Sequence, residues 1–187
     1  MSKHETINFY SDAGPDFTPG TLTTPDIPTY VYDKDLASAL KSRKVSKAGA
    51  VRLYESMLVI REFEEMILKL RTGAYEPISD YNYRGPTHLS IGQEATAAGI
   101  CDCLEIEDYI TSTHRGHGHC IAKGVDVKEM MAELYGKATG SCNGKGGSMH
   151  IADVHKGMMG ANGIVGAGGP LACGPGLAAK VLGKDDV

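Results

Sequence analysis

Residues 46–73 read SKAGAVRLYESMLVIREFEEMILKLRTG, and this stretch carries the clearest structural signal in the chain. Its apolar side chains recur every three or four residues, at Leu53, Met57, Ile60, Phe63, Ile67 and Leu70. This spacing places them on one face of an amphipathic helix. Gly73 follows as the residue that ends the helix in a left-handed conformation. We therefore predict a helix from Ser46 to about Thr72 that buries one face against a core.

The residues before this helix have a different composition. Four prolines (Pro15, Pro19, Pro25 and Pro28) stand among Asp, Thr and Gly, with no helical or strand period. Residues 1–45 are therefore predicted to form an extended arm, with a short helix near residues 33–41. The domain proper is predicted over residues 46–187.

Further elements are predicted beyond the long helix. A turn-rich loop at residues 82–88 leads to a small-residue helix from about Gly92, and a short strand is expected at residues 108–111. Residues 113–119, THRGHGH, follow as a loop. Asp126 is the expected N-cap of a helix to about Tyr135, because Glu129 stands three residues later as in a capping box.

Glycine dominates the last third of the chain. Thirteen of the 24 glycines fall between Gly136 and Gly176, and glycine is costly in helices, so this stretch is predicted to be mostly loop. Pro170 is the expected first residue of a last helix to about Leu182, and Pro175 should kink that helix or delay its start. Residues 144–148, GKGGS, are not a phosphate-binding Walker motif, because the lysine precedes the glycine pair.

Composition excludes several classes of function. The chain has 187 residues and a formal net charge of -4, so no strong positive field indicates nucleic acid or an anionic membrane as a partner. No apolar run approaches the roughly 20 residues that span a bilayer. The first residues, MSKHETINFYSDAG, contain no apolar core of a secretory signal. The chain has five cysteines, and an odd number argues against a framework of disulfides. Together with the missing signal sequence, this favours a reducing cytoplasm.

A cluster of histidines is the first candidate site. His114, His117 and His119 surround Arg115. Neutral imidazoles bind zinc, although no carboxylate or cysteine ligand follows at a motif spacing. Alternatively, Arg115 can donate two parallel hydrogen bonds to a phosphate, with a histidine as a further donor. A plain surface loop is the third interpretation. Cys101 and Cys103 are expected to be buried structural thiols.

Four stretches carry a family resemblance: HLSIGQEA (88–95), THRGHGH (113–119), GKGGSMH (144–150) and GANGIVGA (160–167). In this order and spacing they resemble the α subunits of thiamine-diphosphate-dependent E1 components, the first enzymes of 2-oxo acid and acetoin dehydrogenase complexes. The resemblance covers about residues 50–187 and excludes the arm. It implies an α/β fold class, the N-terminal part of a thiamine-diphosphate-binding fold in which helices flank a parallel sheet.

The resemblance implies roles for six residues. His114 and Arg115 match the pair that contacts the diphosphate, and His88 matches a catalytic histidine that faces substrate or the lipoyl group. His117 and His150 are secondary candidates. No metal ligand is assigned in this chain, and the family's catalytic glutamate belongs to the β subunit.

The other three residues are Gly163, Ile164 and Val165. The backbone groups of Gly163 and Val165 match positions that hydrogen-bond the aminopyrimidine ring of the cofactor. Ile164 between them matches the side chain that supports the bent conformation of the cofactor.

The resemblance also implies a reaction and partners. The cofactor is thiamine diphosphate, the substrate is pyruvate, another 2-oxo acid or acetoin, and the two-carbon acyl unit passes to the lipoyl domain of E2. An E1 β subunit completes an α2β2 heterotetramer within a cytoplasmic multienzyme complex. The forms of residues 113–118 and 148–153 look like the acetoin-type branch, and pyruvate-type subunits are very similar.

Two departures from the family pattern are visible. The Gly-Asp-Gly motif and the later Asn that hold magnesium are missing, so the Mg ligands are expected in a C-terminal half that the sequence lacks. The chain is therefore expected to be truncated and not to hold the cofactor alone. Pro175 stands where the family has a regular helix. The alternatives are a non-catalytic remnant or interaction module that binds an E1 β subunit, and a zinc module using the three clustered histidines.

Overall fold

The computed structural model describes residues 18–21, 26–31, 33–77 and 85–185. Its contacts divide the chain into two units, Met1–Asp35 and Leu36–Val187. The described residues of the first unit form no helix or strand. The rest of the predicted arm before residue 33, and residues 82–84 of the predicted turn-rich loop, lie outside the described residues. The division of the chain at residue 45 stays a prediction.

The long helix is confirmed as α2 (Lys47–Thr72), preceded by the short helix α1 (Leu36–Lys41). The Ser46 hydroxyl caps α2 by accepting a 2.9 Å hydrogen bond from the Gly49 amide. Gly73 ends the helix with a φ of 70°, and its N–H bonds the Lys69 carbonyl. Ile60, Phe63 and Ile67 are buried as the spacing predicts. The apolar face of α2 therefore forms one wall of the core.

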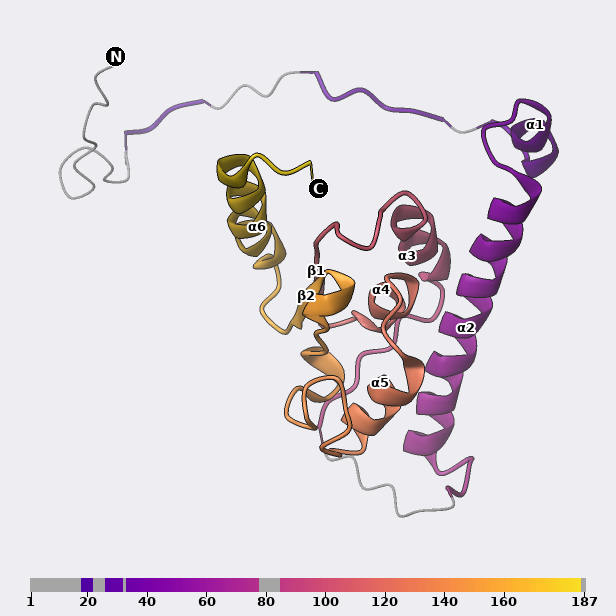
Figure 1. The fold of residues 1–187 in the computed structure, drawn as a ribbon, viewed down its shortest axis with the longest axis vertical. Coiled ribbons are helices and arrows are strands. Elements are labelled where there is room, and N and C mark those ends of the chain that lie inside the picture. Colours follow the sequence, from indigo (N-terminus) through magenta and orange to yellow (C-terminus); the bar gives the residue numbers. More distant parts are fainter. Residues whose placement is uncertain (1–17, 22–25, 32, 78–84, 186–187) are drawn as a thin grey trace. The chain divides into compact units, whose positions relative to one another are not determined.

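Three shorter helices lie against α2 or next to it (Figure 1). They are α3 (Glu94–Cys101), α4 (His117–Ala122) and α5 (Val127–Leu134), and α3 and α4 both contact α2. The predicted N-cap of α5 is confirmed, because the Asp126 carboxylate accepts from the amides of Lys128 and Glu129. The core contains side chains from α2, α4, α5, the sheet and the segment before β2, including Phe63, Met130, Ile151 and Met158.

The sheet of the described residues has two parallel strands, β1 (Ile110–Thr113) and β2 (Met158–Asn162). Thr113 pairs with Asn162 at their carboxyl ends. The crossover between the strands contains α4 and α5, as parallel pairing requires. The structure thus has the mixed helices and small parallel sheet that the α/β class predicts.

Three sequence predictions need correction here. The first strand begins at Ile110, two residues later than expected, and the histidine-rich segment becomes helix α4 from His117 onwards. The second strand, β2, lies inside the stretch predicted as mostly loop. Its Gly160 has a φ of 140°, which weakens any strand signal in the sequence.

The last helix, α6 (Gly168–Leu182), also begins differently from the prediction. Pro170 occupies its third position instead of its first, which costs no hydrogen bond because the first amides of a helix have no partner within it. Pro175 neither delays the start nor ends the helix, although it removes one donor. Ala179 is the buried residue of α6, so most of this helix faces solvent. Across the described part of the chain, the search for a helix suited to spanning a membrane found none.

Candidate functional site

Two histidines meet beside the carboxyl end of β1. His88 lies in the segment before α3, and His114 lies in the turn after β1. Their half-buried rings meet edge to face, with centroids 4.8 Å apart and planes at 82°. His114 Nδ1 is buried and has no hydrogen-bond partner among the described residues. A buried ring nitrogen without a partner is unusual, and it marks this turn as a candidate for contact with a ligand.

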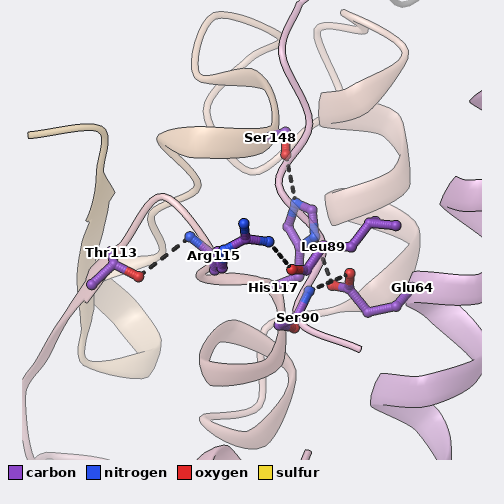
Figure 2. Close-up of polar contacts among 7 residues, drawn as sticks. All are labelled: Glu64, Leu89, Ser90, Thr113, Arg115, His117 and Ser148. Atoms are coloured by element: carbon purple, nitrogen blue, oxygen red, sulfur yellow. Dashed lines mark hydrogen bonds and ion pairs between the residues drawn. The ribbon is translucent and has the colours of Figure 1, made fainter. Parts of the chain in front are cut away.

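Arg115 follows in the same turn and is exposed. Its Nη1 donates to the Leu89 carbonyl, and its backbone N–H donates to Thr113 Oγ1 at 3.3 Å (Figure 2). The guanidinium is therefore fastened to the segment that carries His88. Because a guanidinium has five N–H donors, this contact leaves Arg115 able to bind an anion as well.

Gly163, Ile164 and Val165 form the turn between β2 and α6. The Ile164 amide donates to Asn162 Oδ1 at 2.7 Å, and the Ala167 amide donates to the Ile164 carbonyl at 3.2 Å. The side chains of Ile164 and Val165 are 72% and 78% exposed. The turn thus presents two apolar side chains away from the core.

The strand register brings the two turns together. Thr113 and Asn162 pair at the carboxyl ends of β1 and β2, so His114–Arg115 and Gly163–Val165 leave the same edge of the sheet. Open parallel sheets bind ligands at this edge. A methyl group at Gly116 would lie 2.9 Å from Ala161 Cβ, so the first turn sits tightly against β2.

A buried polar network lies beneath this edge. His117 Nδ1 is 2.7 Å from Glu64 Oε1, and His117 Nε2 is 2.9 Å from Ser148 Oγ. The other oxygen of Glu64 accepts from the Ser90 amide at 2.9 Å (Figure 2). Glu64, His117 and Ser148 are each 0% exposed.

The sequence prediction missed Glu64 and treated His117 as secondary. A signal for Glu64 was present, because this carboxylate stands four residues after Ile60 and three before Ile67, on the apolar face of α2. A charged residue on a buried face needs a partner, and a buried histidine is a suitable one.

The histidine network argues against the zinc interpretation. Both ring nitrogens of His117 are engaged within the protein, and His119 Nδ1 lies 2.7 Å from Ser112 Oγ. Burial lowers the pKa of His119. Within the part of the chain that the structure describes, no group of three His, Cys, Asp or Glu side chains could hold a metal ion. The clustered histidines therefore serve separate contacts.

The glycine-rich loop surrounds a carboxylate of its own chain. Glu133 on α5 accepts four backbone hydrogen bonds of 2.6–3.0 Å, from the amides of Cys142, Gly144, Gly146 and Gly147. Burial acts to raise the pKa of Glu133, but the amides of these residues outweigh it and lower the pKa. These amides are engaged inside the protein, which explains why a Walker-like appearance here does not make a phosphate site.

The remaining candidates have structural environments. His150 lies near the second turn, because a methyl group at Gly163 would be 3.5 Å from His150 Cε1. Cys101 is buried as expected and burial raises its pKa, whereas Cys103 is exposed, contrary to expectation. A cavity of about 350 Å³ beside the glycine-rich loop has none of the six predicted site residues in its lining.

Comparison with known proteins gives a consistent set of matches. A family model described as the dehydrogenase E1 component matches residues 68–187. The α subunit of acetoin:2,6-dichlorophenolindophenol oxidoreductase from Cupriavidus necator is 54% identical over 143 residues, covering 76% of this chain and 41% of that protein. Its counterpart in Bacillus subtilis is 57% identical over 136 residues, covering 73% and 39%.

A more distant relative is the pyruvate dehydrogenase E1 component subunit alpha of Zymomonas mobilis subsp. mobilis. It is 38% identical over 156 residues, which cover 83% of this chain and 42% of that protein. The chain therefore spans about two fifths of the length of the curated relatives it matches.

Proposed function

Because the chain belongs to the dehydrogenase E1 component family, we propose that it acts as an E1 α subunit on acetoin or pyruvate. The proposed reaction uses thiamine diphosphate to cleave the substrate and passes the two-carbon acyl unit to the lipoyl group of E2. The activity is proposed for an α2β2 assembly with E1 β subunits, because the curated relatives it matches are named as alpha subunits.

One observation supports this function most directly. The register of β1 and β2 places His114–Arg115 and Gly163–Val165 at the same carboxyl edge of the sheet. One turn offers a cation and a ring nitrogen without a partner among the described residues, and the other offers backbone groups beside exposed apolar side chains. A ligand with an anionic end and a flat heteroaromatic end matches that pair of turns.

The residues present fit thiamine diphosphate. The Arg115 guanidinium and the buried His114 Nδ1 would hold the diphosphate. The backbone groups of Gly163 and Val165 would bond the aminopyrimidine ring, with Ile164 packed against the cofactor. When bound, the cofactor supplies a nucleophilic carbon for the substrate carbonyl. No residue of this chain is assigned to magnesium.

His88 is proposed to face the substrate or the incoming lipoyl group. Its ring is fixed edge to face against His114, so its orientation is coupled to the turn that would bind the diphosphate. A histidine in this place can hold or move a proton at a substrate oxygen. We also propose a cytoplasmic location, which five free thiols favour.

Calorimetric titration of thiamine diphosphate, in the presence of Mg²⁺, tests the function on the complex of this chain with an acetoin-type E1 β subunit. Arg115→Ala should weaken binding about ten- to a hundredfold, because a charged hydrogen bond is lost. Arg52→Ala is the matched control, since Arg52 forms an exposed pair with Asp102 at 3.4 Å. Equal affinity of the Arg115 variant and the wild type would contradict the assignment. A complex that forms but binds no cofactor would favour the non-catalytic interaction module instead.

A further inference from the structure

We propose that Glu64 is a positioning residue that holds together the three segments carrying His88, His114–Arg115 and Ser148. Its role in catalysis rests on the function proposed above, but its role in holding the segments does not. Glu64 projects from the middle of α2 and is 0% exposed. Figure 2 shows contacts from all three segments gathered around its carboxylate and His117.

One carboxylate oxygen of Glu64, Oε2, holds the segment that carries His88. Glu64 Oε2 accepts from the Ser90 amide at 2.9 Å. Ser90 directly follows Leu89, whose carbonyl accepts the Arg115 guanidinium. A shift of the Ser90 amide would therefore displace the carbonyl that holds Arg115.

The other carboxylate oxygen, Oε1, holds the segment that carries His114 and Arg115. Glu64 Oε1 lies 2.7 Å from Nδ1 of His117, the first residue of α4 and the second after Arg115. In the arrangement we propose, the carboxylate accepts from Nδ1–H, so Nε2 carries no proton and accepts from the Ser148 hydroxyl at 2.9 Å. We call this chain of two hydrogen bonds the relay. In it, the Ser148 hydroxyl donates to His117 Nε2, and His117 Nδ1–H donates to Glu64 Oε1.

The arrangement of serine, histidine and carboxylate resembles a hydrolytic triad, but burial excludes that use. All three side chains are 0% exposed, and Phe63 lies edge to face on the His117 ring at 5.8 Å. A nucleophile must reach its substrate, and Ser148 is fully buried. The relay instead joins the glycine-rich loop to the turn after β1.

The tautomer of His117 gives a spectroscopic test, with the Glu64→Gln variant of the full 187-residue chain. The Ser90 N–H can only donate, so it keeps the oxygen of the introduced side-chain amide, and the NH₂ group of that side chain then faces His117. This should move the imidazole proton from Nδ1 to Nε2, which ¹⁵N shifts of labelled histidine report. Glu62→Gln on the exposed side of the same helix is the matched control. An unchanged His117 tautomer in Glu64→Gln would overturn the relay.

Amide hydrogen exchange tests the coupling itself. In Glu64→Gln, the peptides covering residues 88–90, 113–117 and 144–150 should exchange about tenfold faster together, as expected for one lost charged hydrogen bond. Glu62→Gln should leave all three unchanged. Faster exchange confined to one segment would overturn the coupling.

A second variant, Ser148→Ala, breaks the relay at its other end. The test then does not depend on correct folding of the Glu64→Gln variant. Ser148→Ala should loosen residues 144–150 and 113–117 together. Ser112→Ala removes a partly buried serine–histidine contact of 2.7 Å that does not involve Glu64, so it is the control. If Ser148→Ala loosens only its own loop, the relay does not couple the segments.

Cofactor titration separates the relay from the proposed function. In the complex with the E1 β subunit, Glu64→Gln should weaken thiamine diphosphate binding, whereas Glu62→Gln should not. Coupled loosening without any change in affinity would uphold the positioning role and contradict the cofactor site.

Discussion

Glu133 accepts hydrogen bonds from four amides of the glycine-rich loop. Around this carboxylate the loop has no space for a side chain at Gly144. A methyl group at Gly144 would lie 2.5 Å from the Gly136 carbonyl carbon, and Gly144 has a φ of 75°. The loop is therefore shaped by the carboxylate and by the glycines that let the backbone approach it.

Replacing Glu133 with glutamine tests this shape. Glutamine can accept through one oxygen only, so the amides that bonded the other oxygen lose their acceptor. We expect Glu133→Gln to lower the free energy of unfolding by about 2–4 kcal/mol in urea titration, since each unsatisfied buried donor costs about 1–3 kcal/mol. Glu129→Gln, on the exposed face of the same helix, should change it little. Equal stability of the two variants would contradict the role of Glu133.

Glu94 predicts a pH dependence of stability. The hydrogen bond from Arg61, at 2.6 Å, lowers the pKa of Glu94 from 4.5 to about 2. Because the folded pKa lies below the unfolded one, the stabilisation is present above about pH 4.5 and is lost as the pH falls towards 2. Glu94→Gln should flatten that part of the stability curve, measured by thermal unfolding from about pH 6 down to about pH 2. Asp102→Asn, in an exposed pair, should not; a curve unchanged in Glu94→Gln would refute the assignment.

At the level of residues, motif positions can be proposed from the sequence, whereas buried polar contacts cannot. His88, His114 and Arg115 were proposed because their motifs resemble a family. Their roles stay predictions, and the structure places their segments in contact. Glu64 and Glu133 were missed because each one's partners are far away in the sequence, at His117 and at the glycine-rich loop. Pairings of this kind depend on tertiary packing, which no local pattern reports.

Helix α4 was missed at the scale of elements because its sequence, HGHCIA, is poor in strong helix formers. Packing explains it instead: a methyl group at Gly118 would lie 3.3 Å from Ile60 Cγ2 and 3.4 Å from Ala97 Cβ, so a glycine lets α4 approach α2 and α3 closely. In contrast, α2 and α5 were predicted correctly, because their apolar period and caps are local signals.

Two glycine substitutions separate close approach from helix propensity. Gly116→Ala would bring Cβ within 2.9 Å of Ala161 Cβ and 3.0 Å of the Thr113 carbonyl oxygen, so we expect a loss of about 1–3 kcal/mol. Gly99→Ala, in α3 with nothing within 4 Å, should stabilise the fold by about 0.5–1 kcal/mol. Chemical denaturation of both variants measures the difference. A Gly116→Ala variant as stable as the wild type would show that β2 and this turn are not in close contact.

The whole molecule exposes an apolar surface on α6. Leu171, Leu177, Val181 and Leu182 are 48%, 62%, 75% and 68% exposed. Apolar side chains gathered on one element mark an interaction surface or a cause of association.

The purified chain is therefore expected to associate with itself as its concentration rises. Leu177→Glu should reduce this association in sedimentation velocity experiments, because a charge then stands in the apolar surface. Ile100→Glu, at a similarly exposed position on α3, should not. Association that is the same in both variants would place the contact elsewhere.

We propose that the turns His114–Arg115 and Gly163–Val165 form one cofactor-binding edge. Amide hydrogen exchange of the complex with the E1 β subunit, with and without thiamine diphosphate and Mg²⁺, tests it most directly. We predict that the cofactor slows exchange in both turns together and leaves the N-terminal half of α2 unchanged. Protection of only one turn, or of neither, would show that the two turns do not bind the cofactor together.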